Sequence, residues 1–273
     1  MNNITLGQYY PAKSLIHSLD ARVKVVLAVL YIVCSFLCKN LISYAVLLLS
    51  AIILILVSRI PLNMILRSLR PILFILLFTV TINMFWTEGE RLLVDWWIIN
   101  IYYEGVLNAV FIGIRIIVLI IGTSIFMTYT TTPIQLTDAL ESLLSPLKLL
   151  HAPVHEFAMM ITIALRFIPI LSEETNKIMS AQKARGADFT NGSLIKRAKA
   201  LIPILVPLFV SSFRRADELA TAMECRCYHG GEGRTRMNIP HYHARDFIML
   251  GVIIIFGAGL VFINTLGIGY TLT

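Results

Sequence analysis

Apolar runs with few or no charged residues divide the chain into candidate membrane-spanning helices. These runs fall at about residues 24–38, 41–58, 71–87, 105–128 and 246–273. A spanning helix needs about 20 mostly apolar residues, and four of the five runs reach or approach that length. The first run is short, so it spans only if Lys24 and Lys39 extend toward the membrane surfaces. The pattern predicts an N-terminal membrane region over residues 1–128 with four spans, and one last span.

The composition agrees with that pattern. Hydrophobic residues make up 57% of the 273 residues and charged residues only 14%, against about 45–50% and about 25% in soluble domains. This excludes an ordinary soluble enzyme, a disordered chain and a secreted disulfide scaffold. The four cysteines occur in two unrelated contexts, so no disulfide framework is expected, and no cleavable signal peptide is evident. The predicted fold class is an all-α polytopic membrane protein.

The basic residues predict the orientation. Fourteen of the 23 Lys and Arg residues lie between residues 129 and 245, and most others lie before the first run or between the second and third. The positive-inside rule then places the N-terminus in the cytoplasm and the C-terminus outside. The net charge of +7 is explained by this topology, so no nucleic-acid partner is expected. The loop 88–104 is acidic and rich in Trp and Tyr, as suits the outer membrane interface.

The cytoplasmic segment 129–245 is unusually apolar for a segment outside the membrane. Its pattern predicts an amphipathic helix over about 134–150 and two long helices over about 154–186 and 194–227. Each long helix has an apolar first half and a charged second half, and Pro169, Pro203 and Pro207 should kink or loosen them. Such helices suit a position under the membrane against apolar protein. The alternative is two further spans, which would make seven in all.

The two long helices end alike. Aligning Arg185 with Arg226 places Ala184 on Cys225 and Gly186 on Cys227. Each helix therefore presents one arginine between small residues near its C-terminus, where a cation interacts well with the exposed carbonyls. Small neighbours leave the guanidinium free to enter a groove on a partner. Gly186 suits a left-handed helix stop, as does Gly230 or Gly231 beyond the second helix. A single Ala-Arg-Gly is common capping; two matched copies favour a functional site.

With these residues the chain resembles the transmembrane T component of energy-coupling-factor (ECF) transporters. The resemblance rests on residues 184–186, on 225–227 and on the segment 228–235 that follows, and it covers essentially the whole chain. One departure is that Cys225 and Cys227 replace the small residues that often flank the second arginine. The arginine itself is kept, so the expected docking role is retained.

The resemblance implies a subunit of an ATP-driven importer. Two ABC-type ATPase subunits carry the ATP and magnesium, a small membrane S component binds a vitamin or metal ion, and this chain links them without binding a cofactor. The two long helices cross, and each motif arginine docks on one ATPase. The expected platform for the S component consists of apolar and proline residues of the two helices: Leu165, Phe167, Ile168, Pro169, Ile202, Pro203, Leu205, Pro207 and Phe209. Glycines offer the expected joints: Gly192, Gly230, Gly231 and Gly233. The expected location is the plasma membrane of a prokaryote.

Arg115 and a group of cysteine and histidine residues are further candidate sites. Arg115 lies within the run 105–128, and an intramembrane charge is a functional candidate by default. We favour a structural or partner-facing role for it, with Asn83 and Asn108 as plausible neighbours. Cys225, Cys227 and His229 carry zinc-ligand chemistry, but a fourth ligand is not obvious, and no metal site is expected. We expect both cysteines to act as small packing residues beside Arg226.

No catalytic arrangement stands out in the sequence. There is no GxxxxGK[ST] phosphate loop, no HExxH and no GxSxG, so the chain should not hydrolyse ATP itself. Apart from Asp246 at the first position of the last run, the spans lack Asp and Glu, which argues against a proton-coupled carrier. A stand-alone carrier or channel is the alternative function, and a membrane-anchored enzyme or scaffold is a third, unsupported by any reactive constellation.

Overall fold

The computed structural model describes residues 9–86, 92–96, 99–150, 152–187, 189, 193–231 and 241–266. Within them the chain is an all-α polytopic membrane protein, as expected. The helices are α1 (Ala21–Leu37), α2 (Leu41–Ser58), α3 (Leu62–Leu69), α4 (Leu73–Trp86), α5 (Tyr103–Thr123), α6 (Pro133–Leu143), α7 (Val154–Ala184), α8 (Leu194–Cys225) and α9 (Ala244–Thr265). A short antiparallel hairpin, β1 (Leu92–Trp96) and β2 (Ile99–Tyr102), occupies part of the loop 88–104.

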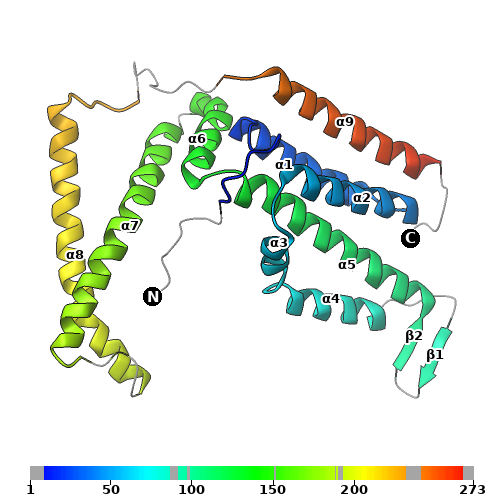
Figure 1. The fold of residues 1–273 in the computed structure, drawn as a ribbon, viewed down its shortest axis with the longest axis horizontal. Helices are drawn as coiled ribbons and strands as arrows, with labels where there is room; N and C mark the ends of the chain where they lie inside the picture. The colour runs from blue at the N-terminus through cyan, green and yellow to red at the C-terminus, as the bar shows by residue number, and fades with distance from the viewer. Residues whose placement is uncertain are drawn as a thin grey trace. The chain divides into compact units, whose positions relative to one another are not determined.

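The chain forms two compact units, with the boundary inside α6. The bundle unit comprises residues 7–139 and 240–273, and the two-helix unit comprises residues 140–239. In the bundle unit, α1 packs between α5 and α9, α2 contacts both α5 and α9, and α4 lies along α5 (Figure 1). Its core is a cluster of buried apolar side chains centred on α1, α2 and α5.

Several predicted segments differ from the observed helices. Residues 59–70, which lie between the predicted spans 41–58 and 71–87, contain α3, which meets α4 at a bend of 59°. The predicted helix 134–150 is two pieces, α6 and a 3₁₀ turn over Ser145–Leu150, because Pro146 has no N–H to continue the α-helical ladder. The run 105–128 is α5 followed by a π-helical stretch, Ser124–Tyr129.

Length and apolarity allow four described helical segments to cross a membrane: Leu41–Ser58, Tyr103–Tyr129, Val154–Ala184 and Ala244–Thr265. A fifth is possible if the bent pair α3 and α4 forms one span. With that pair, the number of candidate spans agrees with the expected five. The helices that make up the five differ from those expected. With 17 residues, α1 is shorter than these segments, whereas α7, expected in the cytoplasm, is long and apolar enough.

Lys24 corrects an expectation about the first span. Its side chain does not extend to a surface, because Lys24 is only 2% exposed. Its ammonium donates hydrogen bonds to the carbonyls of Thr130 at 2.8 Å and His17 at 3.3 Å. Thr130 caps the π-helical stretch, so a buried cation is paired with the carbonyl end of a helix.

The turn between α1 and α2 is held from two neighbouring helices. From α5, Arg115 donates to the carbonyl of Cys38 at 3.2 Å and to the hydroxyl of Tyr44. From α9, the amide of Asn264 donates to the carbonyl of Leu37 at 2.5 Å. Cys38 is the C-cap of α1, so the intramembrane cation satisfies a helix end. Asn83 and Asn108, the neighbours expected for Arg115, are not its hydrogen-bond partners.

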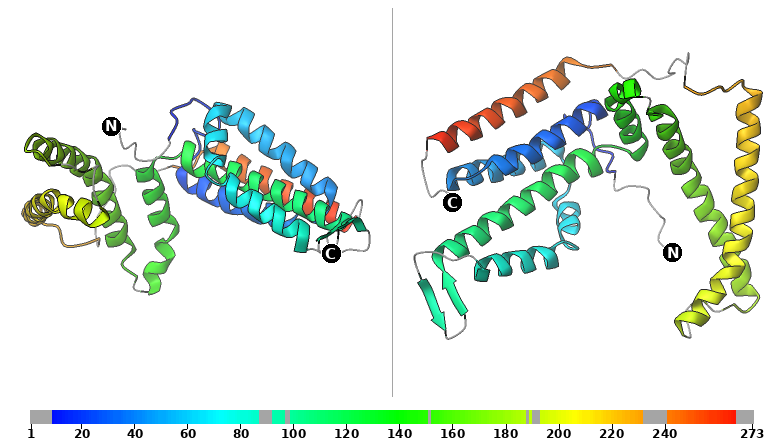
Figure 2. Two further views of the ribbon diagram at one scale, coloured as in Figure 1. Left: turned by 90° about the horizontal axis from the view of Figure 1, so that it is seen from below. Right: turned by 180° about the vertical axis from the view of Figure 1, so that it is seen from behind.

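The two-helix unit consists mainly of α7 and α8, which pack against each other. Figures 1 and 2 show the helices crossing near the C-terminal half of α7, with α8 bent after a short N-terminal part. Pro203 and Pro207 lie inside α8, and Pro169 lies inside α7, so α8 carries the prolines expected to kink it.

Candidate functional site

The end of α7 is a complete Schellman cap. The amide of Ala187 donates to the carbonyl of Gln182, and the amide of Gly186 to that of Lys183, both at 3.0 Å. Gly186 has φ +87°, the left-handed conformation that glycine adopts without steric cost. Arg185 is the C-cap. The helix therefore stops where Gly186 was expected to stop it, and Arg185 is the last residue before the chain turns away.

The end of α8 repeats the same cap with different residues. The amide of Tyr228 donates to the carbonyl of Met223 at 3.1 Å, and that of Cys227 to Glu224 at 2.8 Å. Cys227 occupies the left-handed position with φ +53°. The expectation that Gly230 or Gly231 would stop this helix is wrong, because the Schellman geometry closes three residues earlier. Cys227 takes the place of Gly186 despite the steric cost of a Cβ there.

Arg185 and Arg226 therefore occupy equivalent positions. Their φ and ψ angles are −85° and 6° for Arg185, and −93° and 15° for Arg226. Both arginines are exposed, as are the flanking residues Ala184, Gly186, Cys225 and Cys227. Figure 1 places the C-termini of α7 and α8 at opposite ends of the helix pair. The unit thus presents two similar, accessible guanidinium groups in two separate places.

A polar contact joins the two helices where they cross. Glu174 of α7 accepts hydrogen bonds from the hydroxyl of Ser211 and the guanidinium of Arg215, both at 2.6 Å. Arg185 follows Glu174 by 11 positions, and Arg226 follows Arg215 by 11 positions. At 1.5 Å per residue, each end arginine is about 16 Å along its helix from this contact. This contact was not predicted from the sequence. Glu174 and Arg215 carry opposite charges and have the same separation along the chain as Arg185 and Arg226, and that pattern was a usable signal for the contact.

The apolar half of α8 is exposed along one face. Ile202, Leu205, Val206, Phe209, Val210 and Phe213 are each 53–65% exposed. Their spacing of three or four residues makes a continuous stripe, opposite the face that carries the buried Ile204 and the two residues bonded to α7, Ser211 and Arg215. Pro203 and Pro207 are exposed beside the stripe. On α7, Ile168 and Pro169 are exposed, while Leu165 and Phe167 are half-buried. These faces need lipid or a partner protein.

The four glycines expected as joints differ in backbone conformation and in surroundings. Gly192 and Gly233 lie outside the described residues. Gly230 has a left-handed backbone, with φ +94°. A Cβ on Gly231 would lie 2.6 Å from the ring of His155, so this glycine permits a close packing contact. The ring of His155 is also hydrogen-bonded to Glu141 at 2.9 Å. The joint role of the four glycines stays a prediction.

The cysteines beside Arg226 do not belong to a metal-ligand cluster within the described part of the chain. No group of three or more His, Cys, Asp or Glu residues there is arranged to hold a metal ion. Both Cys225 and Cys227 are exposed free thiols. Cys227 occupies the left-handed cap position, where its Cβ carries a steric cost that glycine would avoid.

A family model described as "Cobalt transport protein" (CbiQ) matches residues 12–237. The chain is 50% identical over 256 residues to "Energy-coupling factor transporter transmembrane protein EcfT" of Ruminiclostridium cellulolyticum, covering 94% of this chain and 95% of the relative. The protein with the same name from Clostridium kluyveri is 51% identical over 249 residues, covering 91% and 92%. That from Bacillus subtilis is 43% identical over 264 residues, covering 97% and 99%.

The chain belongs to the EcfT family of energy-coupling factor transporter transmembrane proteins. The resemblance drawn from the paired arginine motifs is thereby confirmed. Membership agrees with the apolar helices and makes this chain a multi-pass membrane component of a transporter. The names of the relatives are those of transmembrane components, which is consistent with a non-catalytic subunit.

Proposed function

We propose that this EcfT-family chain is the coupling subunit of an ATP-driven importer, linking two cytoplasmic ABC-type ATPases to a small membrane S component that binds a vitamin or metal ion. The observation that carries the proposal is the pair of matched, exposed arginine caps at separate ends of two packed helices. Two similar arginine ends suit two similar grooves, and a guanidinium on a helix end can fork onto carboxylates or carbonyls.

The contact at Glu174 supports a mechanical link between the two ends. Because Arg185 and Arg226 lie on stiff helices joined at that contact, movement of one docked end is passed to the other helix. The exposed stripe on α8, together with Ile168 and Pro169 of α7, is the proposed surface for the S component. ATP and magnesium belong to the partner ATPases in this proposal.

The docking role is tested by purification of the complex from membranes through a tag on this chain. Arg185→Ala and Arg226→Ala are each expected to lower recovery of the ATPases at least severalfold, and the double variant to abolish recovery and uptake. Lys177→Ala and Arg214→Ala are matched controls, because these cations are exposed on the same helices away from the ends. Normal recovery and uptake with the double variant would contradict the proposal.

The platform role has a separate readout. Leu205→Gln with Phe209→Gln places polar groups on the exposed stripe and should reduce recovery of the S component while both ATPases remain bound. Ala216→Gln with Ala220→Gln is the control, because these exposed residues lie in the charged half of α8. Equal retention of the S component by the two variants would argue against this surface. Substrate transport by the purified chain alone in liposomes would favour the stand-alone carrier instead.

A further inference from the structure

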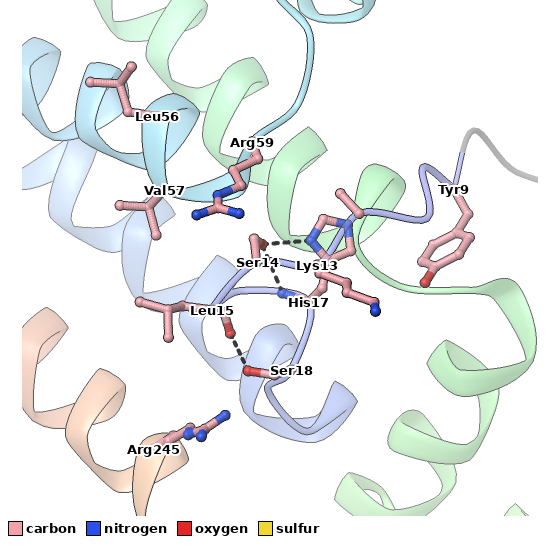
Figure 3. Close-up of a pocket in the computed structure, with 11 residues that line it drawn as sticks. Tyr9, Lys13, Ser14, Leu15, His17, Ser18, Leu56, Val57, Arg59 and Arg245 are labelled. Atoms are coloured by element: carbon pink, nitrogen blue, oxygen red, sulfur yellow. Dashed lines mark hydrogen bonds between the residues drawn. The ribbon is translucent and has the colours of Figure 1, made fainter.

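An open cavity of about 820 Å³ lies in the bundle unit beside the start of α1, the end of α2 and the start of α9. Three cations line it from three different segments (Figure 3): Lys13 from the chain before α1, Arg59 after α2, and Arg245 from the first turn of α9. We call this cavity the basic pocket. Since α2 and α9 are long and apolar enough to span, the pocket lies where two candidate spans begin or end.

The three cations of the basic pocket have no ion-pair partner within the described part of the chain. Lys13, Arg59 and Arg245 are exposed, and none of their side chains has a hydrogen bond or ion pair there. The nearby acidic residues are engaged by backbone amides. Asp246 accepts from the amides of Asp20 at 3.0 Å and His243 at 2.8 Å, and Asp20 accepts from that of Arg22 at 2.9 Å.

The loop that carries Lys13 is held in place by His17. The Nε2 of His17 is 2.9 Å from the carbonyl of Tyr10, and Nδ1 is 2.7 Å from the hydroxyl of Ser14. A carbonyl only accepts, so Nε2 carries the proton of the neutral ring and Ser14 donates to Nδ1. Burial lowers the pKa of His17, which favours this neutral form. The pocket is therefore preorganised, with its charge supplied by the three cations.

Arg59 occupies an unfavourable backbone conformation. It caps α2 with φ +56°, in the left-handed region, where glycine or asparagine meets a smaller steric cost. A long cation at such a position indicates that its side chain is useful there. In Figure 3 the guanidinium of Arg59 extends over the pocket toward Ser14.

The basic pocket continues onto exposed apolar surface. Leu56, which lines it, is 71% exposed, and Leu49 and Ile53 lie on the same face of α2 at 57% and 51%. On α9, Ile248, Val252 and Ile255 follow Arg245 at helical spacing and are 54–73% exposed. A bound molecule that has an anionic group and long apolar chains would match both parts.

We propose that the basic pocket binds the headgroup of an anionic phospholipid, whose acyl chains lie along the exposed faces of α2 and α9. Basic pockets between transmembrane helices recognise such headgroups, and arginine can fork onto a phosphate. Free phosphate shares the headgroup chemistry but leaves the apolar faces unused. The site is independent of the coupling role proposed above, because its residues belong to neither α7 nor α8.

The test measures binding of short-chain phosphatidylglycerol to the purified full-length chain in detergent, by native mass spectrometry and by titration. Short-chain phosphatidylcholine and inorganic phosphate are the comparison ligands. Each cation near a membrane surface should contribute roughly fivefold to affinity. The triple variant Lys13→Gln, Arg59→Gln, Arg245→Gln should therefore weaken phosphatidylglycerol binding by about 100-fold.

The control triple variant Lys39→Gln, Arg67→Gln, Arg70→Gln removes the same charge from exposed positions outside the pocket and should bind as the unchanged chain does. If the pocket triple variant does not fold, Lys13→Gln and Arg245→Gln alone should each weaken binding roughly fivefold. Equal binding of the two lipids, an unchanged affinity in the pocket variants, or competition by phosphate at the same concentration would overturn the proposal.

Discussion

Two buried or half-buried cations of the bundle unit and two end cations of the two-helix unit have opposite surroundings. In the bundle unit the cations Lys24 and Arg115 meet carbonyls or hydroxyls of neighbouring segments. In the two-helix unit Arg185 and Arg226 are exposed at helix ends. The difference teaches that the role of a charged residue in a mostly apolar chain follows from its surroundings. A cation whose hydrogen bonds are satisfied within the fold stabilises the fold, whereas an exposed cation at a helix end is available to a partner.

Arg115→Leu should give the largest loss of stability. It removes charge-assisted hydrogen bonds to Cys38 and Tyr44 and takes the Arg115 donor away from the carbonyl of Cys38 at the end of α1, with an expected cost of about 2–3 kcal/mol. Arg226→Leu should leave unfolding unchanged within about 0.5 kcal/mol. Unfolding of the purified chain in detergent measures both. If Arg115→Leu and Arg226→Leu change the free energy of unfolding equally, the two cations do not differ in the way described.

Lys24→Met should have a somewhat smaller effect, about 1–2 kcal/mol. Two carbonyls lose their donor, but methionine keeps the apolar part of the side chain and removes the cost of burying a charge. The same unfolding measurement applies, with the exposed Lys13→Met as the control. A variant as stable as the unchanged chain would show that the buried ammonium contributes nothing net.

Removing the contact between Glu174 and Arg215 should cost about 1 kcal/mol, since both side chains are partly exposed and solvent weakens their attraction. A double-mutant cycle of Glu174→Gln and Arg215→Ala isolates the pairwise contribution. Glu173 with Arg214, adjacent exposed residues without this contact, is the control pair. Additive effects of the two changes would mean that the contact does not join the helices energetically.

Cys227→Gly should have the smallest effect and the opposite sign. Glycine relieves the left-handed strain at the end of α8, so the cap should gain about 0.5–1 kcal/mol. Hydrogen exchange of the Tyr228 amide, which donates to Met223, should slow about threefold. Cys225→Gly, at a helical position, should instead loosen the end. Faster exchange in the Cys227 variant would contradict the cap described for α8.

Much of the architecture followed from local patterns. The apolar runs predicted at 41–58, 105–128 and 246–273 coincide with α2, with α5 and its π-helical extension, and with α9. Small residues around two arginines marked the ends of α7 and α8. The misses also have local causes. Pro146 divided the predicted helix 134–150, and the Schellman bonds closed α8 at Cys227 before any glycine was reached.

The sequence by itself determined the apolar helices, the paired arginine motifs and thus the family, because these depend on residue type and spacing along one chain. The tertiary structure decided which polar groups meet. Lys24 with Thr130, Arg115 with Cys38, and Glu174 with Arg215 join residues 41 to 106 positions apart, and the basic pocket gathers three segments. Such pairings depend on how helices pack, which the periodicity of a single helix does not encode.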